Sequence, residues 1–109
     1  MPRFIVTGCY TPAAFKGMIA SPSDREAAVR ALVEASGGKL ESFYITTGAS
    51  DFTLTASVDD VSDLLAGLLA AAGSGAVSDF RTQRAFTGAE FLAIQKKAGG
   101  LAGDYKAPA

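Results

Sequence analysis

The stretch TGASDF, residues 47–52, places a carboxylate, Asp51, in the connection between two expected strands. Two interpretations of Asp51 remain open. In the first, which we favour, its carboxylate accepts hydrogen bonds from nearby backbone N–H groups and holds the turn in shape. In the second, Asp51 faces a pocket together with Arg84 or Tyr44, where a carboxylate can act as a general base.

Two arginines offer a different kind of chemistry. Arg81 and Arg84 are three residues apart on an expected strand, so their side chains point to opposite faces of a sheet. One is expected in solvent, and the other can anchor an anionic ligand through two parallel hydrogen bonds. The favoured alternative is an ordinary ion pair with Asp79 or Glu41.

Tyrosines provide two further candidates. Tyr10 and Tyr44 each combine an apolar ring with a hydroxyl group, and either phenol can bind a ligand, although such tyrosines more often belong to a core. Thr53 begins a small polar set on the strand after the hairpin. The candidate ligand-pocket residues are therefore Tyr10, Tyr44, Asp51, Thr53 and Arg84.

The absence of histidine narrows the chemistry further. With no histidine and one cysteine, Cys9, the chain lacks the residues for a Ser-His-Asp triad or for the common zinc and iron sites, so no metal is expected. Without a histidine to activate it, Cys9 is interpreted as a small hydrophobe. No dinucleotide-binding or Walker pattern follows a strand, and no cofactor is expected.

Composition indicates a single folded domain. The 109 residues are 49% hydrophobic, and the 10 basic and 11 acidic side chains give a net charge of −1. A near-neutral surface offers no electrostatic footprint for nucleic acid. The longest apolar run is far shorter than the roughly 20 residues that span a bilayer. A lone cysteine and the lack of a recognisable signal peptide favour a cytoplasmic location.

Periodicity and turn residues divide the chain into alternating elements. Strands are predicted at residues 3–10, 40–47, 52–58 and 77–86, and helices at 23–36, 59–72 and 87–98. A short helical turn, 13–18, follows Thr11-Pro12. Ser23 with Glu26, and Thr87 with Glu90, are interpreted as capping boxes. The domain is expected to cover residues 1–98, and the tail 99–109 is expected to be loose or to pack on a partner.

This order of elements indicates an α+β, ferredoxin-like βαββαβ fold with an additional C-terminal helix. Because crossover connections are right-handed, the four-stranded antiparallel sheet is expected in the order 4-1-3-2. Helices cover one face of such a sheet and leave the other open. The third strand supplies an apolar set for the covered face and a small polar set for the open face: Phe52, Leu54, Ala56 and Val58, against Thr53, Thr55 and Ser57.

The open face is expected to carry enough exposed apolar and aromatic area to favour association with another molecule. Pairing two such faces would hide this area in a dimer. The polar-lined interior of that dimer could hold a small molecule.

Several segments together resemble the GYD-domain family, namely YTPAAFKGMIASPSDREAAV, GGKLESFYITTG, GASDF and VDD, within a match from about Pro2 to Lys97. The resemblance implies a dimeric α+β barrel assembly of ferredoxin-like chains, a group that also includes small cofactor-independent oxygenases. The family is named for a Gly-Tyr-Asp hairpin. Gly48 and Asp51 match its glycine and aspartate, whereas Ser50 stands where its tyrosine would be.

Three functional hypotheses follow. The leading one is a homo-oligomeric module, a homodimer or larger, that binds a small organic molecule or serves assembly. The alternative is a small cofactor-independent enzyme, oxygenase- or isomerase-like, that uses Asp51 and Tyr44 on an aromatic or enolisable substrate; fold analogy alone supports it. The third is structural, with Phe91, Ile94 and Leu101 joining copies in a ring. Neither nucleic acid nor a membrane is an expected partner.

Overall fold

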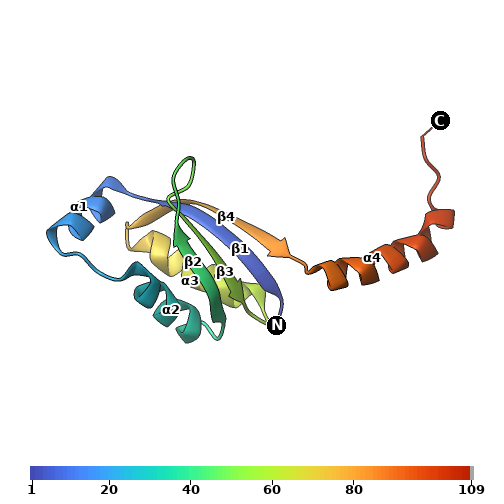
Figure 1. The fold of residues 1–109 in the computed structure, drawn as a ribbon, viewed down its shortest axis with the longest axis horizontal. Coiled ribbons are helices and arrows are strands. Elements are labelled where there is room, and N and C mark those ends of the chain that lie inside the picture. The colour runs from blue at the N-terminus through green and yellow to red at the C-terminus, as the bar shows by residue number, and fades with distance from the viewer. Residues whose placement is uncertain (109) are drawn as a thin grey trace.

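The computed structural model describes residues 1–108 of the chain. Its elements follow one another as shown in Figure 1: β1 (Arg3–Tyr10), α1 (Pro12–Ala20), α2 (Arg25–Ala35), β2 (Lys39–Ile45), β3 (Phe52–Ser57), α3 (Val61–Gly73), β4 (Val77–Ala85), α4 (Gly88–Leu101) and the 3-10 turn η1 (Ala102–Asp104). All predicted strands and helices are present. The predicted helical turn after Thr11 is a full nine-residue helix, α1.

The strands form one antiparallel sheet in the order β2-β3-β1-β4, which confirms the predicted order 4-1-3-2 and the α+β fold class. Its hydrogen-bond register is interrupted twice. One irregularity lies in the pairing of β1 with β4, between Thr7 and Cys9, and the other in the pairing of β2 with β3, between Leu40 and Ser42. Asp79, which lies within the first irregularity, has a positive φ of 55°.

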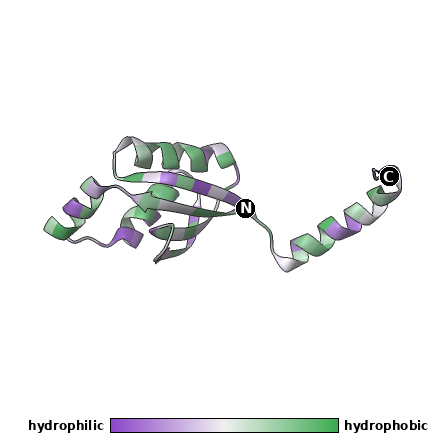
Figure 2. Cartoon of the chain, turned by 90° about the horizontal axis from the view of Figure 1, so that it is seen from above, coloured by the Kyte–Doolittle hydropathy of each residue, from purple (hydrophilic) through white to green (hydrophobic). Residues whose placement is uncertain are grey.

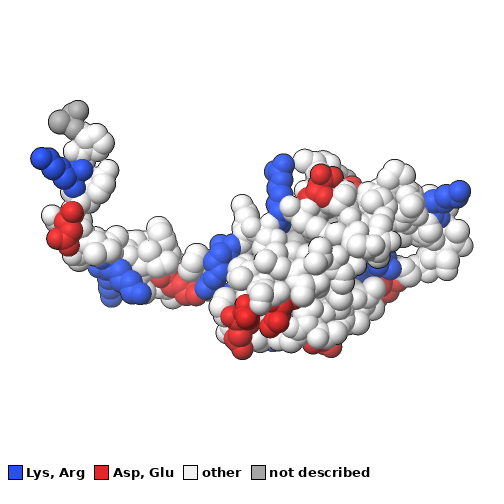
Figure 3. Space-filling model, turned by 180° about the vertical axis from the view of Figure 1, so that it is seen from behind, with Lys and Arg blue, Asp and Glu red and all other residues white. Residues whose placement is uncertain are grey.

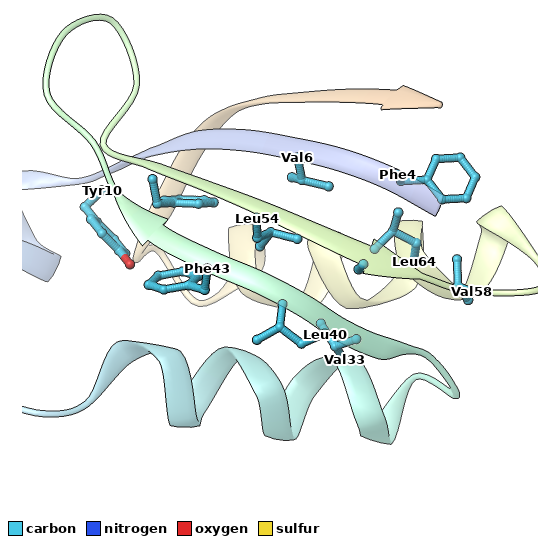
Figure 4. Packing of buried hydrophobic residues seen from close by; sticks show 11 residues of the cluster. Phe4, Val6, Tyr10, Val33, Leu40, Phe43, Leu54, Val58 and Leu64 are labelled. Carbon is cyan, nitrogen blue, oxygen red and sulfur yellow. The ribbon is translucent and has the colours of Figure 1, made fainter. Parts of the chain in front are cut away.

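The hydrophobic core lies on the face of the sheet that α2 and α3 cover (Figure 4). The apolar set predicted from the third strand is buried there, as the alternation requires. Phe52 is central to it, since its ring lies 5.3 Å from that of Tyr10, 6.2 Å from that of Phe43 and 6.4 Å from that of Phe80, measured between centroids. This aromatic cluster joins β1, β2, β3 and β4.

The predicted capping box of Ser23 and Glu26 is wrong by one residue. Asp24 is the N-cap of α2, and its Oδ1 accepts a hydrogen bond from the Ala27 N–H at 3.2 Å. Glu26 lies in the first turn and pairs with Arg30 at 3.1 Å. Aspartate and serine are similarly good N-caps, so the sequence pattern alone does not choose between them.

The C-terminal helix α4 projects from the body of the molecule (Figures 1 and 2). It begins with the predicted capping box of Thr87 and Glu90 and continues through Gly99 and Gly100, beyond its predicted end. The principal extents are 61 × 32 × 22 Å. The radius of gyration is 17.8 Å, against about 13 Å for a compact chain of this length. None of the helices in residues 1–108 combines the length and hydropathy that crossing a membrane requires.

Candidate functional site

The open face of the sheet carries one continuous row of polar side chains. In antiparallel strands, directly opposed residues have side chains on the same face. Tyr44 lies opposite Thr53, Thr53 opposite Thr7, and Thr7 opposite Arg81. Tyr44 is 65% exposed, and the two threonines are half-buried. Two of the predicted site residues, Tyr44 and Thr53, are therefore neighbours on the open face.

Arg84 lies on the opposite face, the one that the helices cover. It is paired with Phe4 of the core, and its guanidinium carbon is 5.7 Å from the centroid of that ring and 4.2 Å from that of Phe86. Its Nη2 lies 3.9 Å from an oxygen of Glu90, in the first turn of α4. Arg84 of β4 thus contacts the first turn of α4 and does not lie beside Tyr44 and Thr53.

Tyr10 is also on the covered face, where it is 8% exposed. Its ring lies against those of Phe15 and Phe52, with centroids 5.7 and 5.3 Å away. The five predicted residues therefore do not line one pocket within a single chain. The physical reason is the register, because β4 places Arg81, rather than Arg84, in the row that contains Tyr44.

Burial raises the pKa of the Tyr10 phenol above its usual value, the Arg25 guanidinium acts against this shift, and the Asp51 carboxylate adds to it. The phenol is accordingly neutral at pH 7 and can donate a hydrogen bond. Arg25 was not among the predicted site residues, because its sequence context indicated only the first turn of a helix.

The Asp51 carboxylate bonds to β1 rather than to the backbone of its own turn. Its Oδ2 accepts a hydrogen bond at 2.9 Å from the backbone N–H of Tyr10, which is 41 residues earlier in the chain. Its own N–H donates to the Gly8 carbonyl oxygen, and its carbonyl oxygen accepts from the N–H of Thr46, both at 2.8 Å. The role of Asp51 is structural, but the predicted bond to nearby N–H groups of its own turn is wrong, because the carboxylate's partner lies on β1. Gly48 provides the positive φ of 101° that the hairpin needs.

We expect the substitution Asp51→Ala to lower the free energy of unfolding by about 1.5 kcal/mol, because it leaves the Tyr10 N–H without its charged acceptor. Asp51→Asn retains an acceptor oxygen and is expected to lose less. Urea unfolding measures the free energies, and amide hydrogen exchange at Tyr10 reports the bond directly. Asp59→Ala, at an exposed position, is the matched control. Equal losses for the alanine and asparagine variants, with unchanged exchange at Tyr10, would contradict this assignment.

Cys9 lies on the open face at the base of the hairpin, half-buried, and its Sγ is 3.4 Å from the Ala49 carbonyl oxygen. No group of three or more histidine, cysteine, aspartate or glutamate side chains within residues 1–108 is arranged to hold a metal ion.

The hairpin, the sheet and the first part of α4 fall within one family match. The family model for the GYD domain matches residues 4–94, which include the hairpin with Gly48 and Asp51 and all of the sheet except Arg3. No curated protein and no solved structure matches the chain. Since the family match covers most of its length, the chain belongs to the GYD domain family.

Proposed function

We propose that this protein is a homo-oligomeric assembly module in which helix α4 of one chain packs on a second copy. The observation that carries the proposal is the position of α4. It projects from the body (Figure 2). Among the described residues, its main contacts are with the adjoining turn η1, and Glu90 of its first turn lies 3.9 Å from Arg84. The helix nevertheless carries large apolar residues. Phe91, Ile94 and Leu101 are 56%, 39% and 64% exposed in the single chain.

The apolar residues of α4 form a seam suited to packing against another element. Phe91, Ile94, Ala98 and Leu101 follow one another at intervals of three, four and three residues, the a/d spacing of a packed helix. We refer to these four residues as the α4 seam. The family match ends at residue 94, so half of the seam lies beyond the matched region.

An isolated α4 would be only marginally stable in water. It has 14 residues, close to the limit of about 12–15 below which isolated helices are marginal. Gly99 and Gly100 lower its helix propensity further, by about 1 kcal/mol each relative to alanine. Packing of the seam against a partner would supply the missing stabilisation.

A second copy of the chain offers a suitable surface. The outer side of α3 and the adjacent strand β4 form an apolar groove, lined by Leu65, Leu68, Leu69, Ala72, Phe80 and Thr82. Leu65 and Leu69 are 53% and 75% exposed. The α4 of the same chain does not cover this groove, because only Phe86 and Thr87 separate it from β4 and the capping box fixes its start.

The distribution of charged side chains also favours a second copy of the chain as the partner of α4. Lys96 and Lys97 lie on α4, whereas Asp59, Asp60 and Asp63 lie at the beginning of α3. Figure 3 shows basic side chains on the projecting helix and acidic ones on the body near the point where that helix leaves it. A basic helix placed across the α3 groove of a second copy would bring opposite charges together.

The open sheet face is the weaker candidate for the interface. Its row of Tyr44, Thr53, Thr7 and Arg81 is mainly polar, and Phe80 packs on the covered face instead. Pairing of two open faces around a small molecule stays a prediction. The enzymatic alternative gains no support from the site, because the described hydrogen bonds do not join Asp51 to Tyr44.

The expected result is an even oligomer by native mass spectrometry and light scattering, and its loss in the double variant Phe91→Glu/Ile94→Glu. Each buried side chain of this size contributes about 1.5–3 kcal/mol, so the dissociation constant should rise at least about 100-fold. The matched control is Ala93→Glu/Gln95→Glu, which adds the same charge to α4 outside the seam. A monomeric wild-type protein, or a seam variant with unchanged mass and circular dichroism, would refute the proposal.

A further inference from the structure

A cleft enters the molecule beside Tyr10, between α1 and the beginning of α2. It consists of two adjoining cavities of about 270 and 210 Å³, which share Tyr10, Arg25 and Ala76 in their walls. The outer cavity is bordered by α1 and by Ser21 and Ser23. The inner cavity extends beneath α2 and α3 to the covered face of the sheet.

The inner cavity is almost entirely apolar. Val29, Leu32, Leu68 and Phe80 are among the side chains that form its walls, and its polar side chains are those of Tyr10, Arg25 and Ser74. An apolar cavity of about 150 Å³ is sufficient to hold benzene. The inner cavity is therefore large enough for a single aromatic ring or a short hydrocarbon chain.

Arg25 brings a positive charge that has no carboxylate partner in residues 1–108 to the boundary between the two cavities. Its Nη1 donates a hydrogen bond to Ser23 Oγ at 3.1 Å, and the guanidinium lies close enough to the Tyr10 phenol to act on its pKa. Its Nε, however, is buried and has no acceptor among residues 1–108. Buried donors in native proteins nearly always have a partner. The guanidinium group is therefore arranged as if an anionic acceptor were to occupy the cleft.

The neighbouring carboxylates are already engaged. Asp24 caps α2 through the Ala27 N–H, Glu26 pairs with Arg30, and Asp51 accepts from the Tyr10 N–H. Within the described part of the chain, neither of the ion pairs involves Arg25. Arg25 is thus the cation at this cleft that remains available to a ligand.

Tyr10 supplies a second polar group at the same point. Figure 4 shows its hydroxyl oxygen directed toward the side of the sheet where α2 lies. The aromatic ring is fixed against Phe15 and Phe52, so the hydroxyl is held in place. Helix α1, which contributes Phe15, has no fully buried residue and forms the outer border of the cleft.

We propose that this cleft binds a small carboxylate with an apolar body, aromatic or short-chain aliphatic, whose carboxylate group is held by Arg25 and Tyr10 and whose body fills the inner cavity. A guanidinium group can donate two parallel hydrogen bonds to a carboxylate, and the free Nε is one of the donors that this geometry uses. The apolar walls then favour the hydrocarbon part over a bare inorganic anion.

The test is isothermal titration calorimetry of the full-length protein with benzoate, octanoate, benzyl alcohol and inorganic phosphate. Saturable binding of benzoate or octanoate is expected, with benzyl alcohol and phosphate each at least about tenfold weaker, because each lacks either the charge or the apolar body. Arg25→Gln should weaken carboxylate binding at least about tenfold, and Tyr10→Phe about threefold. Arg81→Gln removes the same charge from the opposite face and should leave binding unchanged.

Thermal unfolding without ligand separates loss of binding from loss of fold. Because Arg25 Nε has no acceptor, Arg25→Gln should leave the unfolding midpoint unchanged or raise it. Absence of saturable carboxylate binding, equal binding of benzyl alcohol or phosphate, or equal weakening by Arg81→Gln would each overturn the proposal. The measurement is repeated on the Phe91→Glu/Ile94→Glu variant, where binding should be retained because Arg25 and Tyr10 lie outside the α3 groove.

Discussion

Replacing Phe52 by alanine is expected to lower the free energy of unfolding by about 3–5 kcal/mol. The Phe52 side chain is 4% exposed, and its ring is the one that the rings of Tyr10, Phe43 and Phe80 share as a neighbour. Truncation removes its buried apolar surface and leaves a cavity that strands on both sides hold open. Urea unfolding followed by far-ultraviolet circular dichroism measures the loss.

Tyr44→Ala is the matched control, because it removes an aromatic ring of similar size from the adjacent strand. Tyr44 is 65% exposed, and surface substitutions usually change stability by less than about 0.5 kcal/mol. A loss at Phe52 no larger than that at Tyr44 would contradict the assignment of Phe52 to the centre of the core. The Phe52 variant also bears on the ligand cleft, since Phe52 forms part of its inner wall.

The alternation of side chains made much of the fold predictable. A strand with Phe52, Leu54, Ala56 and Val58 on one side and small polar residues on the other has only one orientation beneath a layer of helices. All four of these apolar side chains are at most 5% exposed. The strand order followed from the handedness of the two crossover connections, which depends on the order of the elements and not on individual residues.

The candidate site was less predictable because it depends on register between strands. Alternation within β4 shows that Arg81 and Arg84 face opposite ways, but it does not show which of them shares a face with Tyr44. That choice is made by the irregularity between Thr7 and Cys9, where β4 accommodates Asp79 with its positive φ. An extra residue in one strand shifts the alternation of its side chains between the two faces beyond that point, while directly opposed residues still share a face.

The roles of Asp51 and Arg25 were not predictable because they depend on contacts between residues far apart in the sequence. The Asp51 carboxylate has its partner on β1, and the Arg25 guanidinium acquires its significance only from the cavity that α1, α2 and the sheet enclose. Neither relation has a local signature in the sequence. The presence and the capping box of α4 were predicted correctly, but its direction depends on the chain geometry between Ala85 and Gly88.

A second large loss of stability, at the upper end of about 1–3 kcal/mol or beyond, is expected for Gly8→Val. A Cβ atom at residue 8 would lie 2.6 Å from Cζ of Phe52 and 3.2 Å from Cδ1 of Phe80, both closer than normal van der Waals contact. Valine adds two further methyl groups at this point. The absence of a side chain at Gly8 is therefore what allows the Phe52 ring to lie directly on β1.

This explanation requires the two positions to be energetically coupled. In a Phe52→Leu background, where the clashing Cζ atom is absent, Gly8→Val should cost at least about 1 kcal/mol less than in the wild-type protein, within the range measured for residues in contact. Gly17→Ala is the control for removing a glycine as such: a Cβ there meets no atom within 4 Å, and helix propensity predicts a gain of about 0.5–1 kcal/mol. Strictly additive losses at Gly8 and Phe52 would show that the cost of valine comes from the backbone and not from the ring. The expected coupling would instead show that Gly8 determines how closely the Phe52 ring packs on β1. Because Phe52 lines the inner cavity, Gly8 would then also determine the position of that wall of the cleft beside Tyr10.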